Sequence, residues 1–416
     1  MAVGPAQEGP PAHWAEPVLG WFVVAATLNW VQQVAWRWSE TGWSGAASLL
    51  PGGFEPAAGR IAWDAGLYLR VAENGYRLSE GLEAGFPGYA LAIRAVHALG
   101  AGWGEAAVLV SMASGLAVAL LAWAWMLQAG LELRARRTAL ALLLLYPYAF
   151  VLSGVAYSDP LLVALVLGAL VLANGDHWVL AGLVGGAATA VRPTGLAVVP
   201  ALAVTALDRS GALVVPVRTA VVGLGERVRA GWSTLRGVRL RASALRPVHA
   251  AVLLSLWGVV AYMVFLQRHA GDPFYFWSTQ VSGGYGHGGL SDWQSWTKAS
   301  MVVAPLLEVF WVGDVLNELA ATAVFVAVVL CGPSLGRRFG WGVATLGWAL
   351  AVMVWVFARW MAPAGRYLLP VVPFLAALSA PWLAARPRIR AVVLAVSATG
   401  SFVLAAGFAG WFELHW

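Results

Sequence analysis

The chain has 416 residues, of which 60% are hydrophobic and 11% are charged, and its mean hydropathy is +0.73. A soluble domain needs far more surface charge, so this composition predicts an all-α, polytopic helical membrane protein. The net charge of +6 comes from basic residues that lie between apolar runs. This placement favours contact with anionic membrane lipids and argues against nucleic-acid binding. The single cysteine, Cys331, excludes an intramolecular disulfide and a cysteine-based metal site.

The N-terminal part of the chain predicts a retained span followed by a long loop. Residues 1–16 form a Pro/Gly/Ala-rich tail without a basic region, so the apolar run at 18–36 is predicted to span the membrane instead of serving as a signal peptide. Residues 37–104 then form a polar loop. Within it, 86–99 is apolar but is interrupted by two basic residues and is short for the ~20 residues that a span needs. An interfacial or re-entrant helix is therefore expected there.

Arginine clusters set the predicted orientation. Arg134, Arg136 and Arg137 follow the span at 105–129, and the positive-inside rule makes that loop cytoplasmic. The N-terminus is then cytoplasmic and the loop at 37–104 is external. Three later arginine-rich segments agree with this topology, and they lie at 208–247, 337–338 and 386–390.

We therefore expect one integral-membrane domain over 1–416 with roughly ten spans. Its loops include an arginine-rich cytoplasmic loop at 208–247 and a second external loop at 268–314. The other spans are expected at 138–156, 160–174, 248–267, 315–332, 341–360, 367–384 and 391–411. Residues 179–207 are predicted to form two short helices that meet at Arg192-Pro193, because proline removes a backbone hydrogen bond and breaks a continuous helix.

The stretch 59–76 is a charged island in an otherwise apolar chain, and its pattern predicts a short helix that begins near Trp63-Asp64. Asp64 is either the N-cap of that helix or a general base that faces an acceptor hydroxyl. Glu73, on the same helix, is either a substrate contact or the solvated partner of Arg70 or Arg77.

Two arginines are candidates for phosphate binding. Arg192 lies in the middle of an apolar stretch, where a charge is costly and therefore indicates function by default. A guanidinium binds phosphate through its planar fork, although an internal ion pair with some acid is an equal alternative. Arg366 is expected at the outer surface, where it either holds a lipid phosphate or extends to headgroups. Ser158-Asp159-Pro160 fits the start of a helix, with Ser158 or Asp159 as N-cap.

Metal and sugar contacts have weaker signals. His287 lies among glycines without the spacing of a metal site, so it is a candidate for substrate contact only and no metal site is predicted. Most tryptophans lie at span ends, as in aromatic belts. Trp63 is one of the few in an external loop and is a further candidate for substrate contact.

Six motifs occur in order: Trp63-Asp64, 68–76, Phe86-Pro87-Gly88-Tyr89, Ala156-Tyr157-Ser158-Asp159, 188–196 and Arg366-Tyr367-Leu368. In this set the chain resembles the PIG-V group of mannosyltransferases, which are GT-C-type membrane enzymes with a polyprenyl-phosphate sugar donor. Two positions depart from the pattern. Gly88 stands where relatives tend to carry a bulky residue, and Asp159 stands where a glutamate is common.

The resemblance implies a GT-C-like fold and an inverting transfer of a hexose, mannose in that group, to a lipid-linked or glycan acceptor. Transfer would occur at the outer face of a bacterial plasma membrane. Asp64 would be the catalytic base, and the donor phosphate would be bound by Arg192, Arg366 and Tyr367. Substrate contacts would come from Trp63, Tyr68, Glu73, Ser158, Asp159 and His287. No cofactor is predicted, and the sequence leaves a divalent metal requirement open.

Two hypotheses come from other classes of protein. A lipid or lipid-linked-sugar transporter would carry broken helices at paired positions of internal repeats, whereas the sequence contains one such break, at Arg192-Pro193. A non-catalytic subunit would bind partners through the loop at 208–247. Release of polyprenyl phosphate by the isolated chain would argue against both.

Overall fold

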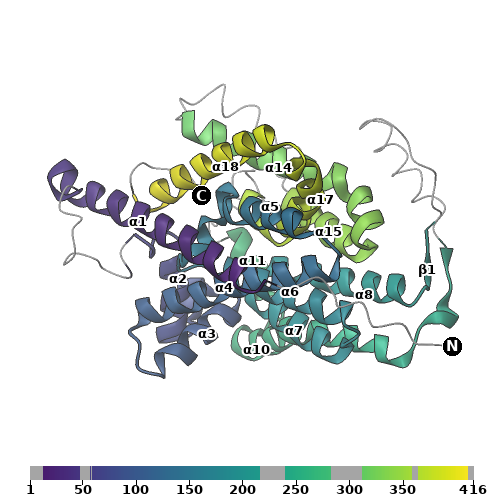
Figure 1. Ribbon diagram of the computed structural model, residues 1–416. Helices are drawn as coiled ribbons and strands as arrows, with labels where there is room; N and C mark the ends of the chain where they lie inside the picture. The colour runs from purple at the N-terminus through teal and green to yellow at the C-terminus, as the bar shows by residue number, and fades with distance from the viewer. Residues whose placement is uncertain are drawn as a thin grey trace.

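The computed structural model describes residues 13–46, 57, 59–215, 239–282, 312–357 and 364–410. They are almost entirely helical, as expected (Figure 1). The α-helices are α1 (Ala15–Ala46), α2 (Ala65–Asn74), α3 (Pro87–His97), α4 (Trp103–Gln128), α5 (Leu133–Leu144), α6 (Asp159–Asn174), α7 (Trp178–Val191), α8 (Val198–Arg209), α10 (Trp257–Ala270), α11 (Tyr275–Ser282), α14 (Val312–Phe339), α15 (Trp341–Phe357), α16 (Ala364–Tyr367), α17 (Val372–Ala384) and α18 (Pro387–Phe408).

Short 3-10 helices and one strand pair complete the described structure. The 3-10 helices are η1 (Leu78–Glu80), η2 (Leu82–Ala84), η3 (Pro147–Ser153), η4 (Pro193–Ala197), η5 (Ala242–Ala244), η6 (Pro247–Leu256) and η7 (Leu369–Val371). The strands β1 (Leu213–Val214) and β2 (Arg239–Leu240) pair antiparallel within the predicted arginine-rich loop. The rest of that loop, 216–238, and residues 283–311 of the second external loop, with His287, lie outside the described residues.

Five helical segments in the described chain are long and apolar enough to cross a membrane, which confirms a helical membrane protein. They are Ala15–Ser39, Trp103–Gln128, Pro247–Ala270, Asn317–Phe339 and Pro387–Phe408. Four shorter apolar helices accompany them, at Asp159–Asn174, Trp178–Val191, Trp341–Val356 and Leu369–Ala384. The total of roughly ten spans and their orientation stay predictions.

The predicted break in 179–207 is confirmed. Helix α7 ends at Val191, Arg192 adopts an extended conformation with φ −157° and ψ 156°, and η4 starts at Pro193. Helix α8 continues the chain after η4. Arg192 is therefore the single extended residue between two helical segments, and its backbone is not part of either helix.

The span predicted over 138–156 is bent and is not one straight helix. Helix α5 and η3 meet at an angle of 86°, and the bend falls at Pro147, which lacks an N–H donor for a continuing helix. Two predicted boundaries also shift. Helix α1 extends to Ala46 instead of ending near residue 36, and the span expected from 367 is divided into α16, η7 and α17.

Glycines allow three close approaches that surround one region of the fold. A Cβ at Gly59 would lie 2.8 Å from the carbonyl oxygen of Gln32, so this residue lets the first loop pack on α1. A Cβ at Gly88 would lie 2.8 Å from the carbonyl oxygen of Ala190. Gly88 thus lets α3 pack against the C-terminal end of α7. Gly186 of α7 makes a similar close approach to α10.

A polar junction holds the first loop to the end of α10. The Tyr262 hydroxyl donates to the backbone oxygen of Glu83 over 2.7 Å, and His269 Nε2 lies 3.1 Å from the buried Glu83 carboxylate. Gln280 of α11 donates to the backbone oxygen of Ala84. The loop between α2 and α3 is therefore tied to residues almost two hundred positions later in the chain.

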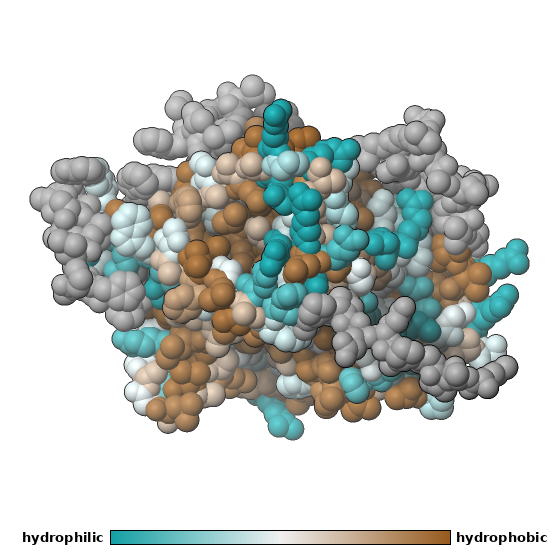
Figure 2. Space-filling view, viewed as in Figure 1, coloured by the Kyte–Doolittle hydropathy of each residue, from teal (hydrophilic) through white to brown (hydrophobic). Residues whose placement is uncertain are grey.

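The outer surface matches that of a protein that contacts lipid. In Figure 2, hydrophobic residues cover much of the lower region, where Figure 1 places α3, α7 and α10, and hydrophilic residues gather higher, over α5 and α17. Helix α1 exposes a stripe of large apolar side chains, including Leu19, Phe22 and Val23. Such an outward apolar face fits helices whose solvent is the bilayer.

Candidate active site

Asp64 precedes α2, but its side chain does not cap that helix. Its backbone has φ −61° and ψ −16°, and the side chain makes no capping hydrogen bond. The N-cap alternative is therefore wrong for the carboxylate. Asp64 Oδ2 instead lies 3.6 Å from Nη2 of Arg366, and the Asp64 backbone N–H donates to the Tyr157 hydroxyl over 3.2 Å. The Asp64 side chain is 46% exposed.

Trp63 occupies a strained position next to Asp64. Its φ is 56°, in the left-handed region that bulky residues seldom adopt and that costs roughly 1–3 kcal/mol. The Trp63 side chain is 51% exposed, so its burial does not offset that strain. Strain of this kind clusters at functional sites, which makes Trp63 a candidate for contact with substrate.

Asp159 pairs with both candidate arginines. Its Oδ2 lies 2.6 Å from Nη1 of Arg192 and 3.8 Å from Nη1 of Arg366. The internal ion pair that was the alternative for Arg192 is thus present, with Asp159 as the acid. Arg366 has a relative exposure of 7%, so the alternative in which it extends to headgroups is wrong.

Aromatic rings complete the surroundings of the two guanidinium groups. The Arg366 guanidinium lies 4.6 Å from the ring centre of Tyr157 and 5.4 Å from that of Tyr367. The Arg192 guanidinium lies 4.8 Å from the Tyr367 ring. Guanidinium groups bind favourably over aromatic faces, most strongly where water is excluded. Tyr367 therefore contacts both arginines at once.

Hydroxyl groups extend the network behind the charged residues. The Tyr68 and Ser158 hydroxyls lie 2.8 Å apart, and Ser111 donates to the backbone oxygen of Tyr157 while its Oγ lies 2.7 Å from the Tyr89 hydroxyl. Burial raises the pKa of Tyr68 and of Tyr157 above the usual value. Both phenols therefore stay protonated at neutral pH, and neither serves as a base.

The four charged residues differ in access to solvent. Two aspartates and two arginines balance in charge, but the side-chain exposures of Asp159, Arg192 and Arg366 are 3%, 11% and 8%, against 46% for Asp64. Asp64 is thus the accessible proton acceptor in this network. Arg366 lies beyond the ~3 Å of an N–H···O hydrogen bond from either carboxylate. Its N–H groups are consequently oriented near an acid without being bonded to it.

Seven of the predicted site residues come together: Asp64, Tyr68, Ser158, Asp159, Arg192, Arg366 and Tyr367. Glu73 does not join them. Its side chain is exposed, and Arg77, one of its expected partners, pairs with Glu80 over 3.5 Å. Within the described residues there is no group of three His, Cys, Asp or Glu side chains that could hold a metal ion.

Sequence reasoning assigned no role to Tyr157, Tyr89 or Ser111. Tyr157 and Tyr89 belong to motifs of the family resemblance, but their hydroxyl partners lie on other elements and leave no local pattern. The only available signal was the concentration of tyrosines in these motifs, because a buried phenol needs a hydrogen-bond partner.

The fold and the site together define a helical membrane protein with a buried arginine pair beside an accessible aspartate. No protein-family model matches the sequence, and no curated protein matches it. Two crystal structures of the oligosaccharyltransferase of Archaeoglobus fulgidus are similar, each at 13% sequence identity. The one tethered with an acceptor peptide containing the NVT sequon has a TM-score of 0.46, over 95% of this chain and 56% of that chain.

The second, in complex with Zn and sulfate, has a TM-score of 0.42, over 94% of this chain and 53% of that chain. This chain therefore spans little more than half the length of the oligosaccharyltransferase. Similarity at these scores does not identify the function, which has to be argued from the residues of the site.

Proposed function

We propose that this protein is a membrane glycosyltransferase that moves a hexose from a polyprenyl-phosphate donor to an acceptor hydroxyl, with Asp64 as general base. The observation that carries the proposal is the contrast between two carboxylates in one network. Asp159 is buried and bound to Arg192, whereas Asp64 is accessible and only loosely paired with Arg366. The ordered motifs shared with the PIG-V group make mannose the sugar to test first.

Asp64 suits the role of base because its carboxylate is open to an incoming group. A general base must reach hydrogen-bond distance of the proton that it removes. The Asp64 side chain is not used in capping α2, and its position is held through its backbone N–H. Proton transfer therefore does not require any contact that holds the carboxylate in place to break.

Arg366 suits the donor phosphate because its guanidinium is positioned by rings and not by a hydrogen-bonded carboxylate. The Arg192–Asp159 pair beside it neutralises one of the two buried cations. The three buried groups then carry a net charge of +1, which complements a phosphodiester. Arginine binds such a group through two parallel N–H···O bonds. Tyr367 supports this arrangement by contacting both guanidinium groups.

The reaction is a single displacement at the anomeric carbon. The acceptor oxygen forms the new bond to that carbon while its proton passes to the Asp64 carboxylate. The bond from the anomeric carbon to the phosphate oxygen breaks, and the electron pair leaves with polyprenyl phosphate. Arg366 and Arg192 stabilise the charge on that phosphate, a contribution of the kind that often dominates catalysis. Attack opposite to the leaving group inverts the anomeric configuration.

The test uses the full chain in detergent, with short-chain polyprenyl-phosphate mannose as donor and an alkyl mannoside as acceptor probe. We expect labelled sugar in the acceptor and stoichiometric release of polyprenyl phosphate. Asp64→Asn is expected to lower kcat by roughly 10²–10⁴-fold, the contribution of a general base, while donor binding is retained. The matched control is Asp176→Asn, which removes the acid of another Asp–Arg pair, at the opposite end of α6.

Unchanged turnover in Asp64→Asn would remove Asp64 from the mechanism. Donor that crosses a vesicle membrane uncleaved, with no release of polyprenyl phosphate, would contradict the transferase and support a transporter. A drop in turnover in Asp176→Asn equal to that in Asp64→Asn would show that the loss reflects general damage to the fold.

A further inference from the structure

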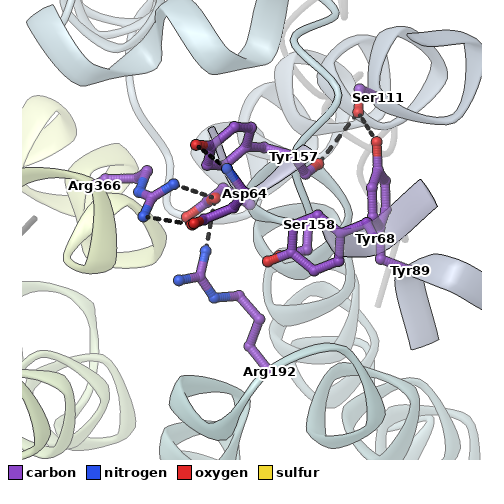
Figure 3. A network of polar contacts seen from close by, with 9 residues as sticks. Asp64, Tyr68, Tyr89, Ser111, Tyr157, Ser158, Arg192 and Arg366 are labelled. Carbon is purple, nitrogen blue, oxygen red and sulfur yellow. Dashed lines mark hydrogen bonds and ion pairs between the residues drawn. The ribbon is translucent and has the colours of Figure 1, made fainter. Parts of the chain in front are cut away.

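We propose that Tyr157 is a positioning residue that keeps the Asp64 carboxylate and the Arg366 guanidinium apart. Asp64 and Arg366 have opposite charges and face each other, yet the nearest atoms of the pair are 3.6 Å apart. In an unrestrained pair, the guanidinium nitrogen atoms approach the carboxylate oxygen atoms to about 2.8 Å and form two parallel hydrogen bonds. Some other group must therefore set their separation, and Tyr157 is the residue that contacts both (Figure 3).

The hydroxyl of Tyr157 restrains the backbone of Asp64. It accepts the hydrogen bond from the Asp64 backbone N–H over 3.2 Å. This contact fixes the main chain at the residue that follows the strained Trp63. The start of α2 is then held in place while the Asp64 side chain stays unbonded at its tip.

The aromatic ring of Tyr157 restrains the Arg366 guanidinium. The Arg366 guanidinium lies over the ring face at 4.6 Å from its centre. A stacked guanidinium gains cation–π attraction and is restrained to a plane parallel to the ring. Asp159 Oδ2 lies 3.8 Å from Arg366 Nη1, which is too far for a hydrogen bond that would restrain the guanidinium in the same way.

Tyr157 can act in this way because it is itself immobilised. The residue is 1% exposed, and its backbone oxygen accepts a hydrogen bond from Ser111 of α4. Its ring makes edge contacts with Tyr68 of α2 and Phe408 of α18, at 6.3 Å and 5.4 Å between ring centres. Groups from three helices therefore fix the phenol against which both charged residues are placed.

The functional consequence rests on the proposed transferase. A closed Asp64–Arg366 pair would occupy the oxygen atoms that must take the acceptor proton. It would also occupy the N–H groups that must bind the donor phosphate. Loss of Tyr157 is thus expected to affect turnover and donor binding together, whereas partial unfolding would lower turnover at an unchanged KM.

The experiment compares Tyr157→Leu with Tyr157→Phe, each in the full chain. Tyr157→Leu removes both contacts, and we expect roughly a hundredfold loss in kcat, the effect of a misplacement near 1 Å, with a raised KM for the donor. Tyr157→Phe keeps the ring under Arg366, so we expect a smaller loss in kcat at an unchanged donor KM. Tyr262→Phe is the control, because it removes another buried hydroxyl, one that donates to Glu83 and Gly85.

A second measurement does not depend on activity. A double-mutant cycle of Asp64→Asn and Arg366→Met, read from unfolding midpoints, measures how strongly the two side chains are coupled. We expect a larger coupling in the Tyr157→Leu background than in the wild-type chain. An equal or smaller coupling, or a folded Tyr157→Leu variant with wild-type kcat and donor KM, would overturn the positioning role. If the wild-type chain transfers no sugar, the proposed function fails while the cycle still decides this inference.

Discussion

The Asp159 carboxylate is bound to the Arg192 guanidinium across 2.6 Å, and this contact joins the start of α6 to the break after α7. Both side chains are largely buried, and the pair lies at the ends of two short apolar helices. Removing two charges from water costs much free energy, which only a favourable geometry of the ion pair can offset. Loss of either Asp159 or Arg192 is therefore expected to change where the arginine side chains lie.

The first prediction concerns the stability that this pair controls. Asp159→Leu leaves Arg192 buried without its acid and is expected to destabilise the protein by about 3–5 kcal/mol. The double variant Asp159→Leu/Arg192→Met removes both charges and should recover most of that loss. Unfolding in detergent, followed by tryptophan fluorescence, measures both. A double variant as unstable as Asp159→Leu would show that the uncompensated charge is not the cause.

The control for that prediction is the exposed Asp176–Arg209 pair, with 3.0 Å between nearest atoms. The hydrogen bond from Arg209 lowers the pKa of Asp176. The stabilisation of the folded state by this pair is therefore complete above the unfolded-state pKa of Asp176. It is lost as the pH falls through the lower folded-state pKa of Asp176. Solvent screening limits the contribution to about 0–1 kcal/mol, so Asp176→Asn should change the unfolding midpoint little at neutral pH.

The break at Arg192 was predictable, whereas the partner of Arg192 was not. A proline after an arginine inside an apolar stretch marks a helix break from local chemistry alone. Asp159 lies on another helix, and no local rule pairs two residues that far apart in the chain. The same limit hid Tyr157, whose contacts come from α2, α4, α16 and α18. Pro147 carried a break signal as clear as that of Pro193, and the span predicted at 138–156 named no bend there.

The second prediction concerns Gly365, which precedes Arg366 in α16. A Cβ at this position would overlap the ring of Tyr148, so the four-residue helix would have to shift. The Tyr146 hydroxyl also donates to the Gly365 backbone oxygen over 2.9 Å, which limits where the helix can go. Gly365→Ala is therefore expected to cost about 1–3 kcal/mol, the range for overpacking, and to raise the donor KM by displacing Arg366.

Gly66→Ala provides the matched control for Gly365→Ala. Gly66 lies in α2, and a Cβ there would meet no atom within 4 Å. Alanine is favoured over glycine in a helix by up to about 1 kcal/mol, so this variant should be as stable as the wild type or more stable. Unfolding midpoints measured side by side test the pair. A Gly365→Ala chain that unfolds with the wild-type midpoint would contradict the steric argument.

The third prediction separates the strain at Trp63 from the use of its indole. Glycine adopts a positive φ without the Cβ clash, whereas alanine keeps the clash and removes the same ring. We expect Trp63→Gly to be more stable than Trp63→Ala by about 1 kcal/mol, the lower end of the cost of a left-handed residue. The exposed indole contributes little by burial, so Trp63→Ala, which keeps the clash, should unfold near the wild-type midpoint.

Transfer kinetics then test what the strained indole does. If the indole contacts a sugar ring of the acceptor beside Asp64, both variants should raise the KM for the acceptor equally, because both lack the ring. Trp63→Phe keeps an aromatic face and should lie between them and the wild type. Equal acceptor KM values in all four proteins would exclude substrate contact by Trp63. A Trp63→Gly chain that is less stable than Trp63→Ala would show instead that the left-handed backbone is not the source of strain at this position.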